Sequence, residues 1–228
     1  VEAALISRAA ALVTAEDAEA PAPADALEAA TALLQLDQEL KAAAAGTNAA
    51  EDFAAVCALL QLAPNPGVLK ALKCEEGSWT KEPAGTVAVR GWQCDLPTLT
   101  ALLVVLPKHP ALKALKFWRC GLAEEHTKLL QRHEPLTSLA VEGDGPTEGG
   151  AAEAAKCAAL GTLSLRGTEL PTAALAPFAD QLREHPSLTA LSLFSTQLGD
   201  AGAALVLGAV KHNTKLVALN LGSNLLSD

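Results

Sequence analysis

The chain has 228 residues, half of them hydrophobic and 19% charged, which is enough for a continuous core in one or two domains. Its formal net charge of −9 argues against a surface that binds nucleic acid, and the sequence has no polybasic segment that would attract it to an anionic membrane. No apolar run approaches the roughly 18 residues of a membrane span. Residues 1–13 are apolar but lack the basic start and cleavage site of a signal peptide.

Five cysteines are spread along the chain without a CxxC pair or a zinc-like spacing. An odd number without such spacing favours reduced, buried thiols in a cytosolic compartment.

The first 66 residues are expected to be helical. Residues 1–19, 24–45 and 51–62 have helical composition, and prolines separate and end these segments. We interpret residues 1–66 as an α-helical N-terminal cap, because a stack of repeats needs an atypical cover over its exposed core. The alternative is an independent helical module with a binding role of its own.

From residue 67 onward the chain carries an apolar LxxLxL pattern that is typical of short strands. Its second apolar position recurs in steps of 28, 24, 24, 28 and 28 residues. These marker positions are Val87, Leu115, Leu139, Leu163, Leu191 and Leu219. Residues two apart on a strand share a face, so the marker and the apolar residue after it point inward. A further copy, Leu69-Leu72-Cys74, lies too close to Val87 for a full repeat and is interpreted as a degenerate or capping strand.

Each predicted strand is followed by a turn and an amphipathic helix. The residue expected at the turn is Trp92, Cys120, Asp144, Thr168, Thr196 or Asn224, of which only the last is the asparagine that best bonds to a turn backbone. The helices are expected at residues 96–109, 123–133, 147–157, 171–185 and 200–213. Asp200 is a candidate N-cap of the last one.

The repeat accounts for most of the histidines. His109, His133 and His185 lie six residues before a marker position, and His212 lies seven before. We expect them at helix C-termini, where the free carbonyls favour a partly cationic ring. His126 is off this register, and beside two glutamates it is interpreted as part of a solvated face.

No catalytic constellation is recognised in the sequence. Phosphate-binding glycine loops, a GxSxG elbow and an HExxH pair are all missing from it. The acidic run from Glu142 to Pro146 lacks the spaced carboxylates of a calcium loop. Cys120 is expected to be a buried structural thiol rather than a nucleophile. We therefore expect no enzyme activity, no cofactor and no metal.

The outward side of the predicted strands is the better candidate for function, because aromatic residues and arginine dominate interface hot spots. Trp118 and Phe194 could anchor a partner or pack against the next repeat, whereas packing is favoured for Trp92. The candidate partner-binding residues are Lys116, Trp118, Arg119, Glu142, Arg166, Phe194 and Asn220. Small residues elsewhere on these strands leave a flat surface for another backbone.

The repeat units resemble ribonuclease-inhibitor-type leucine-rich repeats over residues 87–228. This resemblance implies an α/β leucine-rich-repeat solenoid at residues 67–228, with a parallel β-sheet on the concave face and helices on the convex face. The last strand has no cover, so the solenoid is expected to continue beyond residue 228.

A narrower resemblance rests on the runs LKALKFWRCGL, LTSLAVEGDGP, LGTLSLRGTEL and LVALNLGSNLLSD. They are similar to the repeat block of a leucine-rich-repeat family of motile cilia. This resemblance implies a non-catalytic structural subunit of the axoneme, in the central apparatus or a radial spoke, and so a cytoskeletal location in a cilium or flagellum. Its partners would be protein subunits of a large assembly, with no nucleic acid, membrane or small-molecule substrate. The alternative is a soluble cytosolic regulatory binder, such as an enzyme inhibitor or a GTPase-activating protein that uses Arg119 or Arg166.

Overall fold

A computed structural model describes residues 48–73, 82–131, 136–143 and 150–227. The chain divides into two compact units. Unit one comprises residues 1–74 and 95–109, and unit two comprises residues 75–94 and 110–228. The helices expected at residues 1–19 and 24–45 lie outside the described residues. Within the described ranges, no helix is both long and apolar enough to cross a membrane.

The described part of unit one is helical: α3 (Ala49–Leu59), α4 (Pro66–Leu72), α5 (Leu96–Val105) and the 3-10 helix η1 (Leu106–Lys108). The segment expected as a capping strand is α4, so that prediction is wrong. The Asn65 side chain accepts hydrogen bonds from the backbone N–H groups of Gly67 and Val68, and Pro66 occupies the first helical position. Both features start helices, and they outweigh the strand-like leucine spacing.

The interior of unit one contains a polar pair and a thiol. His109 Nε2 lies 2.8 Å from Asp52 Oδ2, and the Asp52 side chain is only 3% exposed. Burial, with a smaller contribution from the Asp95 carboxylate, raises the pKa of the Cys57 thiol to about 11. A thiol that stays protonated at neutral pH is a packing residue, as expected for the buried cysteines.

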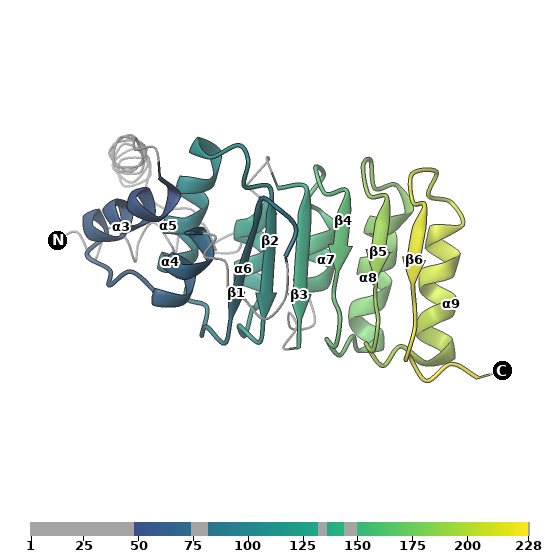
Figure 1. Ribbon diagram of the computed structural model, residues 1–228. Helices are drawn as coiled ribbons and strands as arrows, with labels where there is room; N and C mark the ends of the chain where they lie inside the picture. Colours follow the sequence, from purple (N-terminus) through teal and green to yellow (C-terminus); the bar gives the residue numbers. More distant parts are fainter. Residues whose placement is uncertain (1–47, 74–81, 132–135, 144–149, 228) are drawn as a thin grey trace, which may run out of the picture. The chain divides into compact units, whose positions relative to one another are not determined.

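Unit two contains one open, all-parallel sheet with strands in chain order (Figure 1). The strands are β1 (Thr86–Arg90), β2 (Ala114–Trp118), β3 (Ser138–Glu142), β4 (Thr162–Ser164), β5 (Ala190–Ser192) and β6 (Ala218–Asn220). The register pairs Val87 with Leu115 and continues through the marker residues to Leu219. The steps of 24 and 28 residues therefore correspond to one strand each, which confirms the predicted strand positions.

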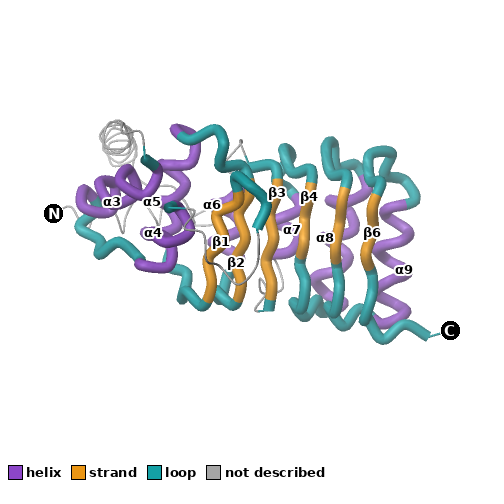
Figure 2. Tube along the Cα trace, in the orientation of Figure 1, coloured by secondary structure: helices purple, strands orange, loops and turns teal. Residues whose placement is uncertain are grey.

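Four helices cover one face of this sheet: α6 (Glu124–Gln131), α7 (Gly150–Ala155), α8 (Thr172–Arg183) and α9 (Gly199–Val210) (Figure 2). Each packs against the next one in the chain. The core lies between the two layers, since the marker residues from Val87 to Leu191 are at most 2% exposed. The alternate strand residues are more exposed and face away from the helices. Unit two is thus an α/β arrangement, and no described helix covers its second sheet face, which we call the open sheet face.

The turn after each strand has a recurring backbone conformation. The residue four positions after each marker has a positive φ, and these residues are Gly91, Arg119, Gly143, Gly167, Ser195 and Ser223. Each of the first five donates its backbone N–H to the carbonyl at the end of the next strand, over 2.8–3.0 Å. The left-handed conformation favours glycine, so the three other side chains are exceptions.

The residue after the positive-φ position points into the core. Trp92, Cys120, Thr168, Thr196 and Asn224 are all at most 5% exposed, and Asp144 lies outside the described residues. The predicted turn positions are therefore correctly placed, and their side chains fill the inside of the turn.

The start of the last helix differs from the prediction. The N-cap position of α9 is Leu198, and Asp200 lies in the first turn. The Asp200 carboxylate instead accepts hydrogen bonds from the backbone N–H and hydroxyl of Ser227, at 2.9 and 2.6 Å. These bonds lower the pKa of Asp200.

Candidate functional site

Most predicted partner-binding residues come together where the strands end. The register places Arg90, Trp118 and Glu142 side by side on β1, β2 and β3. Backbone bonds from Gly143 to Arg166 and from Gly167 to Phe194 extend the row across the next strands. We call this row the exit edge: Arg90, Trp118, Arg119, Glu142, Arg166 and Phe194.

Ion pairs link the first three strands across the open sheet face. Lys116 Nζ lies 3.4 Å from both Glu82 Oε1 and Glu142 Oε1, and an Arg90 guanidinium nitrogen lies 3.5 Å from the same Glu82 oxygen. The four side chains are 17–32% exposed. Partly exposed pairs of this kind contribute little stability each. Together they hold four long charged side chains in a defined pattern over β1–β3.

Arginine side chains stack on the two aromatic rings of the exit edge. The guanidinium carbons of Arg90 and Arg119 lie 5.4 and 5.1 Å from the centre of the Trp118 ring, and Trp118 is 38% exposed. The Arg166 guanidinium carbon lies 4.5 Å from the centre of the Phe194 ring. Each cation–π contact at an exposed site contributes about 0.5–1 kcal/mol. The rings thus serve as supports for charged groups.

Mostly small side chains line the open sheet face beside the exit edge. The register aligns Ala88, Lys116, Ala140, Ser164, Ser192 and Asn220 in one row across the six strands. Apart from Lys116 and Asn220, these side chains are small. Asn220 lies on the last strand, and its side chain accepts a hydrogen bond from the backbone N–H of Gly222 at 3.0 Å. It lies beside Phe194, because a Cβ atom at Gly222 would be 3.1 Å from the Phe194 ring and 3.2 Å from Asn220 Oδ1.

Two residues weighed as functional are part of the core. Trp92 is 5% exposed and packs against Phe117, with ring centroids 6.5 Å apart, so the packing interpretation is confirmed. Cys120 is 1% exposed, and its Sγ lies 3.5 Å from the carbonyl oxygens of Val89 and Trp118. That thiol is structural, as expected.

The interpretation of His126 as part of a solvated face is wrong. Its side chain is buried, Nδ1 accepts a hydrogen bond from the Ala123 backbone N–H at 3.0 Å, and Nε2 lies 3.1 Å from the Cys94 carbonyl oxygen. A ring with two nitrogens can satisfy a donor in one turn and an acceptor in another. This histidine therefore joins the turns of two neighbouring repeats.

The expectation of partly cationic helix-end histidines is wrong for His185. Burial lowers the pKa of His185, and the carbonyl of Cys157 opposes this only in part. Nδ1 accepts hydrogen bonds from the backbone N–H groups of Ser187 and Leu188, which requires a neutral ring nitrogen. His212 is exposed, and the next residue, Asn213, takes the equivalent position. His133 lies outside the described residues.

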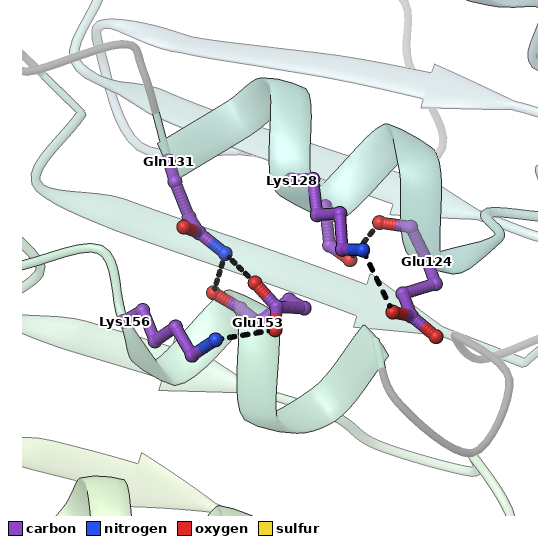
Figure 3. A network of polar contacts seen from close by, with 6 residues as sticks. Glu124, Lys128, Gln131, Glu153 and Lys156 are labelled. Carbon is purple, nitrogen blue, oxygen red and sulfur yellow. Dashed lines mark hydrogen bonds and ion pairs between the residues drawn. The ribbon is translucent and has the colours of Figure 1, made fainter. Parts of the chain in front are cut away.

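A polar network joins α6 and α7 on the helical side of unit two (Figure 3). Gln131 donates to both the backbone carbonyl and the carboxylate of Glu153, and Lys156 Nζ lies 2.5 Å from that carboxylate. Burial raises the pKa of Glu153, but the hydrogen bonds from Lys156 and Gln131 outweigh it and lower the pKa overall. Lys128 pairs with Glu124 within α6, at 3.2 Å. This network ties neighbouring helices together.

Sequence reasoning missed two residues of the charged pattern, Glu82 and Arg90. Arg90 could have been found, since it occupies the same register position as Trp118 and Glu142. Glu82 lies before β1, where the repeat gives no signal. Among the described residues, no group of three or more histidine, cysteine or acidic side chains is arranged to hold a metal ion.

Comparison with known proteins adds no assignment. No protein-family model matches the chain, and no curated protein matches it.

Proposed function

We propose that unit two is a leucine-rich-repeat solenoid that works as a non-catalytic scaffold and binds a protein partner on its open sheet face. The observation that carries this proposal is the exit edge, where an exposed tryptophan and stacked arginines adjoin a row of small residues. Aromatic residues and arginine are the types enriched in interface cores and hot spots. The small row allows the backbone of a partner to approach closely.

Two features support the repeat class. The strands follow each other in steps of 24 or 28 residues with their marker leucines in register. The buried Asn224 side chain bonds both its own turn and the preceding one, at Leu221 and Thr196. Side chains that bridge successive turns are what a stack of identical units requires, because each unit contacts only its neighbours.

The wider role that we propose is that of a structural subunit of the motile-cilium axoneme. It rests on the resemblance of the repeat residues to a ciliary leucine-rich-repeat family. A tagged copy of the protein in a ciliated cell is expected along the axoneme and in the detergent-resistant cytoskeletal fraction. A uniform cytosolic distribution would remove the axonemal role and leave the protein-binding scaffold.

Site-specific photo-crosslinking tests the binding face. A photoreactive amino acid at Ala140 or Ser164, on the open sheet face, should give an adduct with the same partner from both positions. The matched control is the exposed Asp180 on α8, on the helical side, which should not give that adduct. Adducts from Asp180 alone would assign binding to the helices and contradict the proposal.

A regulatory binder that stimulates GTP hydrolysis is the second candidate. Both Arg119 and Arg166 are exposed, as an arginine that enters the active site of a GTPase must be. Acceleration of GTP hydrolysis by the purified chain, lost in Arg119→Ala or Arg166→Ala, would favour this candidate over the scaffold.

A further inference from the structure

Arg119 and Arg166 differ from the other cations of the open sheet face in their partners. Arg90 and Lys116 are already paired with Glu82, and Lys116 also with Glu142. Within the described ranges, no ion pair joins Arg119 or Arg166 to a carboxylate, and their contacts are with the rings of Trp118 and Phe194. The two arginines therefore carry charge that no described acidic group balances.

Stacking fixes these arginines without using their hydrogen-bonding groups. A guanidinium is planar and has five N–H donors around its edge. A contact with an aromatic ring leaves these donors available for a carboxylate, which the guanidinium can bind through two parallel hydrogen bonds. The ring also restricts the long side chain before binding, so less conformational entropy is lost when an anion arrives.

The backbone conformation of Arg119 also supports a binding role for this residue. Arg119 has a φ of 52°, in the left-handed region, at a turn position that is glycine after β1, β3 and β4. An arginine there is strained relative to glycine, by about 1 kcal/mol. Its N–H donates to the Glu142 carbonyl over 2.8 Å, which holds the conformation. Strain of this kind concentrates at binding sites, where the side chain is needed in that place.

Charge selects the class of ligand. The exit edge with Lys116 and Glu82 contains four cations and two carboxylates, on a chain of net charge −9. A local positive excess on an acidic protein attracts acidic segments, and the repulsion of the chain elsewhere directs them to it. Glu82 and Glu142 are paired with Arg90 and Lys116, so Arg119 and Arg166 are the cations of this set that remain for an acidic side chain of a partner.

The spacing of the two arginines limits the sequence that fits. Arg119 follows β2 and Arg166 follows β4, so their backbones are two strand spacings apart, about 10 Å. Three residues of an extended polyproline-type segment span about 9 Å and return side chains to the same side. Two acidic residues three positions apart would meet both arginines.

We propose that the exit edge binds an extended acidic segment of a protein partner, with Arg119 and Arg166 each holding one carboxylate. This inference rests on the proposed scaffold function and specifies the chemistry of the partner.

Fluorescence anisotropy with the full chain tests the proposal. The probe is a short labelled peptide that contains Glu-Pro-Pro-Glu, and its control contains Gln-Pro-Pro-Gln. Arg119→Gln and Arg166→Gln should each weaken binding of the acidic peptide about three- to tenfold, the range for charge-assisted hydrogen bonds at a partly exposed site. Binding should also weaken as salt is added.

Arg183→Gln is the matched control, since it removes the same charge from an exposed position on α8. Equal weakening by Arg183→Gln, or equal affinity for the two peptides, would overturn the proposal, because binding would then follow overall charge or the peptide backbone. If the arginine variants leave peptide binding unchanged while Ala140 and Ser164 still crosslink a partner, this inference fails and the scaffold function stands. Loss of those crosslinks would instead contradict the scaffold function.

Discussion

Two successive repeats of unit two, the β4 repeat (residues 160–187) and the β5 repeat (residues 188–215), have the same length but pair their buried polar atoms differently. In the β4 repeat, the buried Thr168 hydroxyl has no hydrogen-bond partner among the described residues, and buried His185 Nε2 has only a weak contact with the Cys157 carbonyl. At the equivalent positions, the β5 repeat has Thr196 and Asn213, and both are satisfied.

The difference arises from the reach of one side chain. Asn224, one repeat later, extends back to accept a hydrogen bond from the Thr196 backbone N–H at 2.7 Å, and its Oδ1 lies 3.0 Å from the Thr196 hydroxyl. Thr196 is shorter, and its hydroxyl bonds inside its own turn, to the Leu193 carbonyl. The Thr196 side chain does not reach Thr168 in the preceding repeat. The Thr168 backbone N–H donates to the Leu165 carbonyl instead. An amide in the turn therefore joins two repeats, whereas a hydroxyl serves one.

Removal of Asn224 should have the largest effect. Its amide also donates to the carbonyls of Leu193 and Leu221, at 2.6 and 2.8 Å, inside a site that is 2% exposed. Asn224→Leu would remove the partner of the Leu221 carbonyl and of the Thr196 N–H, and should lower the free energy of unfolding by about 3 kcal/mol, measured by urea denaturation. Asn220→Leu is the control, because Asn220 is exposed and its side chain accepts a hydrogen bond from Gly222 in its own turn. Equal losses would show that the buried bridge has no special role.

Two matched threonine substitutions test the comparison of the β4 and β5 repeats, because they should change the free energy of unfolding in different directions. Thr196→Val removes a donor to the Leu193 carbonyl and a partner of Asn224, and should destabilise unit two by about 1–2 kcal/mol. Thr168→Val removes a buried hydroxyl that has no partner and should be neutral or stabilise by up to about 1 kcal/mol. Losses of similar size in both variants would mean that the Thr168 hydroxyl is satisfied in solution.

The strand positions were predictable from sequence because spacing alone determines them. Leucines such as Leu139 and Leu163 recur at fixed intervals, and the alternation of apolar and small or polar residues along each strand indicates which side chains face the core. The exit edge followed in part, since Trp118 and Glu142 occupy one register position. The network at Lys116 was not predictable, because it depends on Glu82, which lies outside the repeat pattern.

The polar interior of the turns was not predictable in the same way. Asn224 and Thr196 occupy positions that the spacing identifies, but hydrogen bonds between repeats depend on side-chain reach over a few tenths of an ångström. His126 and His185 show the same limit: a periodic histidine pattern gives position but not burial, and burial decides charge. Local capping by Asn65 likewise overrode the strand-like leucines of α4.

The residues at the helix ends of the β4 and β5 repeats, His185 and Asn213, predict that the stability of the two repeats depends differently on pH. Because the pKa of His185 is lowered in the folded chain, the unfolded state binds more protons just below pH 6.5. Its contribution to stability is therefore present above that pH and is lost as the pH falls. His185→Asn copies Asn213, whose amide donates to the Leu182 carbonyl at 2.6 Å. The variant should gain stability relative to the wild type as the pH falls from 7 to 5.5, by up to about 1 kcal/mol.

Thermal or urea unfolding at several pH values measures this effect. His212→Asn is the control, since His212 is exposed and adjacent to the same position. A difference between His185→Asn and the wild type that is constant with pH would show that His185 titrates normally in the folded chain.

The last prediction concerns the chemical reactivity of a buried cysteine at the helix end before β4, where we expect the smallest effect on stability. The helix-end position of His185 and Asn213 is occupied there by Cys157, a thiol that is 5% exposed. Burial, then the nearby Glu153 carboxylate, raises the pKa of Cys157 to about 12. At pH 8 only about one thiol in ten thousand would be ionised, so iodoacetamide should modify Cys157 only when the chain unfolds. Half-buried Cys94 is the internal comparison, read out by peptide mass spectrometry. Rapid native-state alkylation of Cys157 would mean that this helix end opens in the folded chain and that burial does not protect the thiol.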